Sequence, residues 1–85
     1  MTYTVALTTR AARDLRHLPT DVSRRIKAAL RELEANPRPP GSVKLTGADE
    51  WRIRIGDYRV RYAIDDPARR VLIPRIAHRR EVYGH

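Results

Sequence analysis

The clearest pattern in the chain is a double alternation of apolar and polar residues over residues 51–62. Gly56 and Asp57 separate the two alternating runs, and two residues of this kind between strands predict a tight β-hairpin. Neighbouring residues of a strand point to opposite faces of the sheet. One face of the predicted hairpin therefore carries the apolar side chains of Trp51, Ile53, Ile55, Tyr58, Val60 and Tyr62.

The opposite face of this hairpin carries four arginines, which we call the arginine face: Arg52, Arg54, Arg59 and Arg61. The predicted pairing places Arg54 opposite Arg59 and Arg52 opposite Arg61. Like charges directly across a ladder destabilise it, so the cluster indicates a surface that meets an anionic ligand. The alternative is a solvated strand face, which charged residues commonly form on a half-exposed sheet. Cross-strand repulsion favours the first interpretation.

The first half of the chain predicts a short strand followed by two helices. Residues 3–7 alternate enough to predict a first strand, and Thr8 or Thr9 can cap a short helix that runs to about residue 17. The apolar side of this helix comprises Ala11, Ala12, Leu15 and Leu18. Pro19 ends it, and Thr20 is the predicted cap of a second helix that stops at Asn36-Pro37. The second helix has its apolar residues at helical spacing: Val22, Ile26, Ala29, Leu30 and Leu33.

The second half of the chain predicts strands. A short strand at residues 43–45 and a loop at residues 47–50 precede the hairpin, whose second strand runs to about Asp65. A turn at residues 65–67 leads to a last strand at residues 71–77. This strand is mostly apolar, so we expect burial on both faces, although Pro74 favours an edge or a bulge. The order β-α-α-β-β-β-β predicts an α+β fold in a single domain, residues 1–85. Its two N-terminal helices pack on one face of a small, mostly antiparallel β-sheet of four to five strands.

The charge and arginine content of the chain indicate which class of partner it binds. The 85 residues carry a net charge of +8, and 16 of the 18 basic residues are arginine, which indicates a polyanionic partner such as nucleic acid. A GC-rich genome would also enrich arginine, so the placement of the arginines carries more of the argument than their number. The chain has no cysteine, no apolar run of membrane-spanning length and no signal peptide at its start, and we expect a cytoplasmic protein.

Few residues outside the hairpin predict chemistry. The three histidines, His17, His78 and His85, have no metal-ligand spacing, and no nucleotide-cofactor motif is present, so we expect neither a metal nor a cofactor. Residues 78–83 add Arg79 and Arg80 and three groups able to transfer protons, which are His78, Glu81 and Tyr83. The alternative interpretation of this segment is a frayed basic tail.

Two motifs together resemble the RelE/ParE toxin superfamily of bacterial toxin–antitoxin modules. They are the hairpin, Trp-Arg-Ile-Arg-Ile-Gly-Asp-Tyr-Arg-Val-Arg-Tyr, and the later Ala-His-Arg-Arg-Glu-Val-Tyr. The similarity also includes the Asn36-Pro37 helix stop and the Val43-Lys44-Leu45 strand before Gly47. In this superfamily one branch, RelE, cleaves mRNA in the ribosomal A site, whereas the ParE branch poisons DNA gyrase.

The resemblance to the RelE branch implies metal-independent RNA cleavage, in which the 2′-OH attacks its own 3′ phosphate. Carried over by motif, the catalytic residues are Arg59, Arg79 and Tyr83; the residues that bind RNA phosphates are Arg52, Arg54, Arg61 and Arg80; His78 and Glu81 are candidate general acids or bases. The best-known RelE pattern has lysines at positions 52 and 54. Arginine effectively cannot lose a proton, so a different group must supply the base.

The resemblance also implies partners, namely a cognate antitoxin in a toxin–antitoxin hetero-oligomer and mRNA on the 70S ribosome. Two alternatives remain open at this point. One is a ParE-like gyrase inhibitor without chemistry of its own. The other is a relative that binds nucleic acid or antitoxin but does not cleave RNA, which the arginines at positions 52 and 54 keep open.

Overall fold

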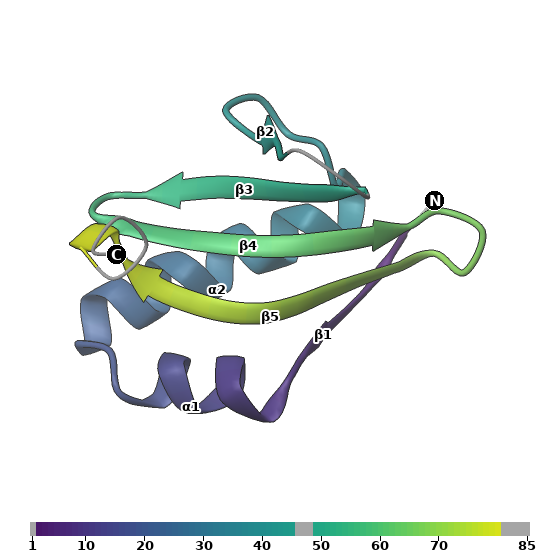
Figure 1. Ribbon diagram of the computed structural model, residues 1–85. Coiled ribbons are helices and arrows are strands. Elements are labelled where there is room, and N and C mark those ends of the chain that lie inside the picture. The colour runs from purple at the N-terminus through teal and green to yellow at the C-terminus, as the bar shows by residue number, and fades with distance from the viewer. Residues whose placement is uncertain (1, 46–48, 81–85) are drawn as a thin grey trace.

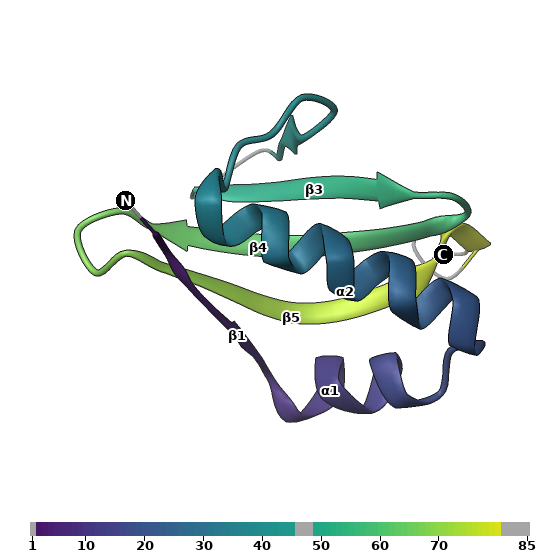
Figure 2. The same cartoon turned by 180° about the vertical axis from the view of Figure 1, so that it is seen from behind.

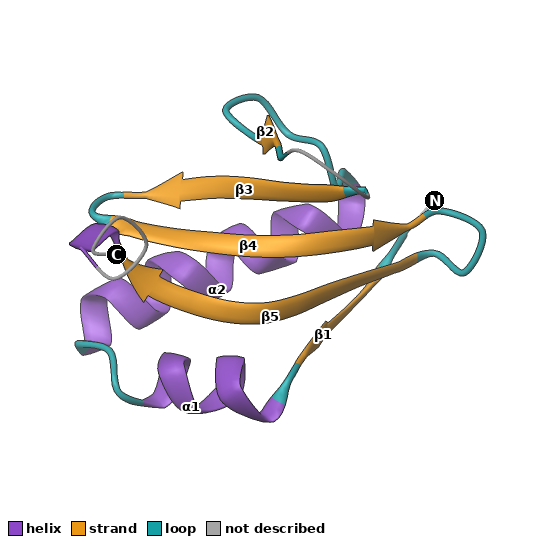
Figure 3. Cartoon of the chain, viewed as in Figure 1, coloured by secondary structure: helices purple, strands orange, loops and turns teal. Residues whose placement is uncertain are grey.

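The computed structural model describes residues 2–45 and 49–80. Within them the elements are β1 (Thr4–Leu7), α1 (Thr9–Arg16), α2 (Thr20–Ala35), β2 (Val43–Lys44), β3 (Glu50–Ile55), β4 (Tyr58–Asp65) and β5 (Arg70–His78) (Figures 1 and 3). The strands form one sheet in the order β1-β5-β4-β3-β2. β1 pairs with β5 in parallel, and the other pairings are antiparallel. The predicted α+β fold and element order are confirmed.

The helices begin and end for identifiable local reasons. The Thr8 side chain accepts a hydrogen bond from the Ala11 N–H at 3.1 Å and caps α1, so Thr8 is the cap of the two that the sequence offered, Thr8 and Thr9. The prediction that Thr20 caps α2 is wrong, because Pro19 is the N-cap residue and Thr20 is already helical, with no side-chain capping bond. The extended backbone of Pro19 directs the chain into the helix without one. Asn36 is extended before a proline and ends α2, as predicted.

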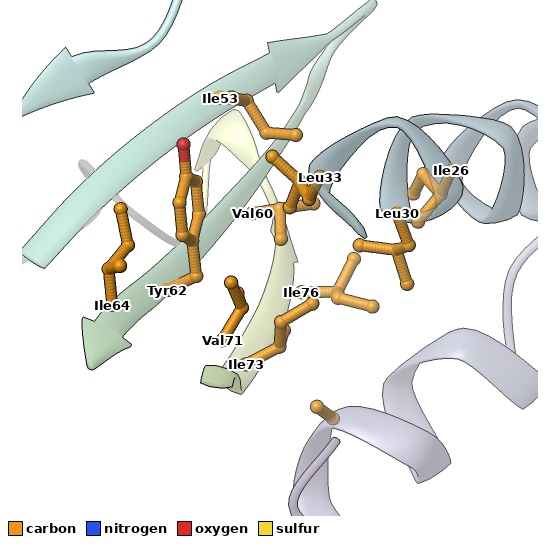
Figure 4. Packing of buried hydrophobic residues seen from close by; sticks show 11 residues of the cluster. Ile26, Leu30, Leu33, Ile53, Val60, Tyr62, Ile64, Val71, Ile73 and Ile76 are labelled. Atoms are coloured by element: carbon orange, nitrogen blue, oxygen red, sulfur yellow. The ribbon is translucent and has the colours of Figure 1, made fainter. Parts of the chain in front are cut away.

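The core lies between α2 and one face of the sheet, which α2 crosses in Figure 2. Figure 4 shows Ile26, Leu30 and Leu33 of α2 directed at the sheet. The three adjacent strands β3, β4 and β5 contribute the other buried residues: Ile53, Val60, Tyr62, Ile64, Val71, Ile73 and Ile76. Tyr62 also donates a hydrogen bond from its buried hydroxyl to the Pro37 carbonyl at 2.7 Å.

The hairpin has the register that the sequence predicts. Ile55 pairs with Tyr58, and the pairing continues residue by residue to Trp51 and Tyr62. Gly56 in the turn has a φ of +60°, which glycine adopts without steric cost. All six apolar residues of the hairpin belong to the core or pack against it, so the arginine face is on the other side of the sheet, away from α2.

A β-bulge in β5 explains how Pro74 fits into a strand. β4 has one residue, Tyr62, between its pairings at Arg61 and Ala63, whereas β5 has two, Ile73 and Pro74. The bulge prediction for Pro74 is confirmed. The extra residue also shifts the alternation of side chains along β5.

The expected burial of β5 on both faces is wrong. Leu72 is 47% exposed although Val71 and Ile73 are fully buried. Within residues 2–45 and 49–80, no helix or second sheet covers Leu72, and an apolar sequence alone does not reveal that. A shallow apolar hollow surrounds this side chain, and its lining includes Ala6 and Ala63.

α1 closes the part of the β5 edge that β1 leaves open. The β1–β5 pairing ends at Leu7 and Ile73. Beyond this point the Thr8 hydroxyl donates to the Pro74 carbonyl at 2.9 Å, and the Asp14 carboxylate accepts from the Ile76 N–H at 3.0 Å. Side chains of α1 thus satisfy backbone groups that a further strand would otherwise pair.

A cluster of polar contacts joins four segments at the end of the sheet opposite the hairpin turn. We call it the far-end cluster: Tyr3, Arg38, Asp49, Trp51 and Asp66. Arg38 donates to Asp49 and to Asp66, each at 2.9 Å, and Tyr3 donates to Asp66 at 2.5 Å. Trp51 donates to Asp49 at 2.7 Å. The hydrogen bonds from Arg38 and Tyr3 lower the pKa of Asp66 below its ordinary value.

Candidate functional site

The arginine face combines two cross-strand arginine pairs on the side of the sheet that α2 does not cover. Arg54 pairs with Arg59 and Arg52 with Arg61. Cα atoms of such antiparallel partners lie about 4.5–5.5 Å apart, so four guanidinium groups extend from a small area of the surface. The sequence predicted both pairs.

Arg59 differs from the other arginines because it is only 7% exposed. It lies on the central strand β4, between Arg54 of β3 and Ala77 of β5. One of its Nη atoms donates to the Tyr58 carbonyl at 3.3 Å. An arginine keeps its charge at any physiological pH. A buried cation attracts an anion more strongly than an exposed one, because less water screens the interaction.

The other members of the arginine face are more accessible. Arg61 and Arg54 are exposed, and Arg52 is half-buried. Arg61 contacts Glu50 at 3.1 Å, with both side chains largely exposed; such a surface ion pair contributes at most about 1 kcal/mol. Arg54 donates from Nε to the Gly56 carbonyl at 3.3 Å. These weak contacts leave the guanidinium groups of Arg54 and Arg61 able to reorient toward a ligand.

Arg75 extends the arginine face, and the sequence analysis missed it. It pairs with Arg61 across the β4–β5 ladder, and its Nε lies 3.9 Å from the Asp14 carboxylate of α1. Strict alternation from Ile73 would have placed Arg75 on the core side. The bulge at Pro74 brings it to the uncovered face instead, and Pro74 was the signal in the sequence that could have revealed this.

Arg79 reaches the same end of the sheet from the segment after β5. Its N–H donates to the Asp57 carbonyl at 2.7 Å, and its guanidinium lies 3.9 Å from the Asp57 carboxylate. Figure 1 shows residues 79–80 beside the β3–β4 turn. The structure thus brings Arg79 to the hairpin turn that separates Arg54 from Arg59. Arg80 is exposed, and its N–H donates to Nδ1 of His78 at 3.2 Å.

His78 lies on the opposite side of the sheet from the arginine face. It pairs with Tyr58, whose ring packs against the core, and the two rings meet edge to face with centroids 5.2 Å apart. His78 shares a shallow pocket with Asp14, His17 and Tyr58. The structure therefore does not bring His78 together with the arginines of the hairpin. Glu81 and Tyr83 lie outside the described residues.

The charge of this surface determines what it can do chemically. The arginine face, Arg75 and Arg79 together contribute six guanidinium groups, and the carboxylates that contact them in the described part of the chain are Asp14, Glu50 and Asp57. Such a surface binds phosphates through charged, often bidentate hydrogen bonds. It can stabilise charge that develops on a phosphate, but arginine cannot serve as a general base.

The described residues contain neither a candidate metal site nor a helix that could span a membrane. Within residues 2–45 and 49–80, no three side chains of histidine, cysteine, aspartate or glutamate lie close enough together to hold a metal ion. Neither helix within these residues is long and apolar enough to cross a membrane.

Comparison with known proteins identifies the family. Residues 5–83 match the sequence model of the ParE toxin of the type II toxin–antitoxin system parDE. The toxin RelE of Mycobacterium tuberculosis is 40% identical, over 95% of this chain and 86% of its own length. The toxin RelG of the same organism is 36% identical over 98% of both chains.

A solved structure gives the same result for the fold. The toxin–antitoxin complex RelBE2 of Mycobacterium tuberculosis contains a chain that superposes with a TM-score of 0.78 at 34% identity. The match covers 92% of this chain and 99% of that one. Sequence and fold therefore agree over nearly the whole length: this chain belongs to the ParE toxin family of type II toxin–antitoxin systems, and the relatives it matches are toxins of the RelE type.

Proposed function

We propose that this toxin is an endoribonuclease that cleaves mRNA in the A site of the ribosome, in the cytoplasm, and so inhibits translation. The observation that carries the proposal is the burial of Arg59 on a sheet face that α2 leaves uncovered, among further arginines. The guanidinium group there is always charged, and a buried site strengthens its attraction for an anion because less water screens the interaction. A phosphate of the RNA backbone is an anion of suitable charge and geometry.

The proposed reaction is a transesterification within the RNA. A base removes the proton of a 2′-OH, and the 2′ oxygen forms a bond to the adjacent phosphorus. The bond from phosphorus to the 5′ oxygen of the next nucleotide breaks, and that oxygen receives a proton. The products are a 2′,3′-cyclic phosphate and a 5′-OH end, and the chain needs neither a metal nor a cofactor for this chemistry.

Each basic residue has a proposed role in this reaction. Arg59 and Arg79 bind the scissile phosphate and stabilise the charge that develops on its oxygens. The neighbouring phosphates are held by Arg52, Arg54, Arg61, Arg75 and Arg80. Tyr83 orients the substrate base by stacking or takes part in proton transfer. Because His78 lies on the other side of the sheet, Glu81, Tyr83 and groups of the ribosome are the better candidates for the base.

We further propose that a cognate antitoxin binds this chain in a hetero-oligomer. The RelBE2 complex of Mycobacterium tuberculosis is a toxin–antitoxin complex, and its toxin-like chain shares the fold described above. An antitoxin that neutralises the toxin would cover or distort the arginine face. Acidic side chains of the antitoxin would suit this strongly basic surface.

The test is primer extension on mRNA incubated with ribosomes and purified protein, beside a lane without ribosomes. The expected result is a set of cuts in the A-site codon that requires ribosomes and leaves a 5′-OH end. Arg79→Ala should reduce cutting by about 100-fold or more. Arg31→Ala is the matched control, because it removes an exposed arginine from α2 and should cut like the parent protein.

A gyrase inhibitor is the second candidate, and the match of residues 5–83 to the ParE toxin model is the observation that favours it. Intact mRNA at high protein concentration would contradict the nuclease proposal. Inhibition of DNA supercoiling by gyrase, lost in Arg79→Ala and kept in Arg31→Ala, would then support the gyrase inhibitor.

A further inference from the structure

The geometry points to His78 as a positioning residue that fixes the course of the Arg79–Arg80 segment beside the hairpin turn, through a hydrogen bond that only neutral Nδ1 can accept. This role rests on the proposed nuclease function, since it concerns how two of its arginines are presented. It differs from the acid or base role that the sequence suggested. Three features of the described residues carry it.

The first feature is the hydrogen bond itself. The Arg80 N–H donates to Nδ1 of His78 at 3.2 Å. A side-chain acceptor that bonds a backbone N–H two residues later fixes the direction of the chain in the way that helix caps and Asx turns do. Here the chain direction after β5 determines where both arginine side chains emerge.

The second feature is that the His78 ring is itself held in place. The Tyr58 ring meets it edge to face, with an interplanar angle of 85° and centroids 5.2 Å apart. Ile76 and Leu18 line the same pocket. A ring with fixed orientation presents Nδ1 in one direction, so the acceptor is preorganised rather than selected from many rotamers.

The third feature is a second attachment of the same segment, made by the neighbouring residue. The Arg79 N–H donates to the Asp57 carbonyl at 2.7 Å. Successive backbone N–H groups are therefore bound to the hairpin turn and to the end of β5. Together they direct the segment toward the turn between Arg54 and Arg59.

Protonation of Nδ1 would disrupt this arrangement. An imidazolium has no acceptor, so the Arg80 N–H would face a second donor, and a new positive charge would lie beside two arginines. Among the described residues, the titratable and charged groups that share the pocket of the ring are Asp14 and His17 from α1 and Tyr58 from β4, and those next to it in the chain are Arg79 and Arg80. The Asp14 carboxylate accepts a hydrogen bond from the Ile76 N–H. The charged residues that follow His78 directly in the chain are the two arginines, Arg79 and Arg80.

Two substitutions separate the acceptor from the ring. His78→Asn keeps an acceptor oxygen at the same number of bonds from the backbone, but it removes the ring and cannot titrate. His78→Phe keeps an aromatic ring against Tyr58 and removes the acceptor. We expect His78→Phe to lower kcat/KM for A-site cleavage by roughly three- to tenfold, the effect of one lost hydrogen bond, and His78→Asn to restore most of this loss.

The pH profile supplies a readout that a merely structural role would not move. At a pH low enough to protonate the imidazole, cleavage by the parent protein should fall further than cleavage by His78→Asn, which has no imidazole to protonate. Equal losses in His78→Phe and His78→Asn with parallel pH profiles would overturn the inference and leave only packing against Tyr58. Parent-like cleavage by His78→Phe would overturn it as well.

A measurement without RNA keeps this inference distinct from the proposed function. Amide hydrogen exchange at Arg80 should be faster in His78→Phe than in the parent protein, and restored in His78→Asn, at unchanged Tm. If the parent protein does not cleave mRNA, the proposed function fails while this exchange pattern still tests the hydrogen bond. Identical Arg80 exchange in all three proteins would overturn the inference whatever the cleavage assay gives.

Discussion

The two ends of the sheet hold arginines in opposite ways. In the far-end cluster a single arginine, Arg38, donates to two carboxylates at 2.9 Å each. Around the hairpin turn, the described carboxylate beside Arg79 is that of Asp57, which lies 3.9 Å from the guanidinium. The far end therefore neutralises its cation within the fold and joins separate segments. Among the described residues, the guanidinium groups at the turn end outnumber the carboxylates that contact them, and such a surface suits an external anion.

The comparison shows that the number of arginines alone does not locate a binding surface. Arg38 also stacks over Trp51, with 5.4 Å from its guanidinium carbon to the ring centroid, so it is saturated with contacts inside the protein. Arg54 and Arg59 face each other across a ladder, where repulsion lowers stability. Residues that destabilise their own sheet are better candidates for function than residues that stabilise it.

The largest expected effect comes from reversing a charge on the arginine face. Arg54→Glu should reduce A-site cleavage by about 100-fold or more. The same substitution should raise the free energy of unfolding by about 0.2–1 kcal/mol, because an opposite charge then pairs with Arg59. Cleavage kinetics and urea denaturation measure the two changes. Arg31→Glu on α2 is the control, and a stability loss in Arg54→Glu would show that Arg54 supports the fold.

The next largest effect is expected in the salt dependence of RNA binding, which should differ between substitutions on the arginine face and in the far-end cluster. Each phosphate contact with single-stranded RNA contributes about 0.7 to the slope of log K against log salt concentration. Arg61→Ala should lower this slope by about 0.7, whereas Arg38→Ala should leave it unchanged. Fluorescence anisotropy with a labelled oligonucleotide at several salt concentrations measures both. Equal slopes for Arg61→Ala and the parent protein would remove Arg61 from the binding surface.

A smaller effect is expected when the far-end cluster is broken. Arg38→Ala should lower the free energy of unfolding by about 1 kcal/mol, because both ion pairs are partly exposed to solvent. Cleavage per folded molecule should stay at the parent level. Thermal denaturation together with single-turnover cleavage tests this, and a cleavage loss without a stability loss would mean that the two ends do not divide their roles as described.

The smallest expected effect is on the stability of the fold at acidic pH. Hydrogen bonds from Arg38 and Tyr3 hold the pKa of Asp66 below its ordinary value of 3.8. A carboxyl group with a lowered pKa stabilises the fold above that ordinary value, and the contribution is lost as pH falls through the lowered pKa. Asp66→Asn should therefore unfold with a weaker dependence on pH below 3.8 than the parent protein. Denaturation midpoints at several acidic pH values measure this, with Asp65→Asn as a control.

The hairpin shows how far sequence alone could lead. Its two-residue turn fixes the register, and the register determines which of Arg54, Arg59 and their neighbours share a face. The structure confirms this pairing throughout. The N-cap of α1 at Thr8 and the end of α2 before Pro37 were equally predictable, because both depend on adjacent residues.

Other features depended on contacts between distant segments. Arg75 lies on the same side of the sheet as the arginine face only because of the bulge at Pro74. The position of a bulge depends on the partner strand. The place of His78 follows from its pairing with Tyr58 across the same shifted ladder. The burial of Arg59 likewise depends on its neighbours in the folded sheet rather than on the residues next to it in the chain.

The measurement that tests the central claim most directly is single-turnover cleavage of ribosome-bound mRNA by Arg59→Ala and Arg38→Ala, each corrected for its folded fraction. Arg59→Lys, which keeps a positive charge, controls for the loss of a buried side chain. We expect Arg59→Ala to cut at least about 100-fold more slowly than the parent protein, Arg59→Lys to recover part of the rate, and Arg38→Ala to match the parent. Parent-like cleavage by folded Arg59→Ala, or equal losses in Arg59→Ala and Arg38→Ala, would contradict the assignment of the arginine face as the RNA-cleaving surface.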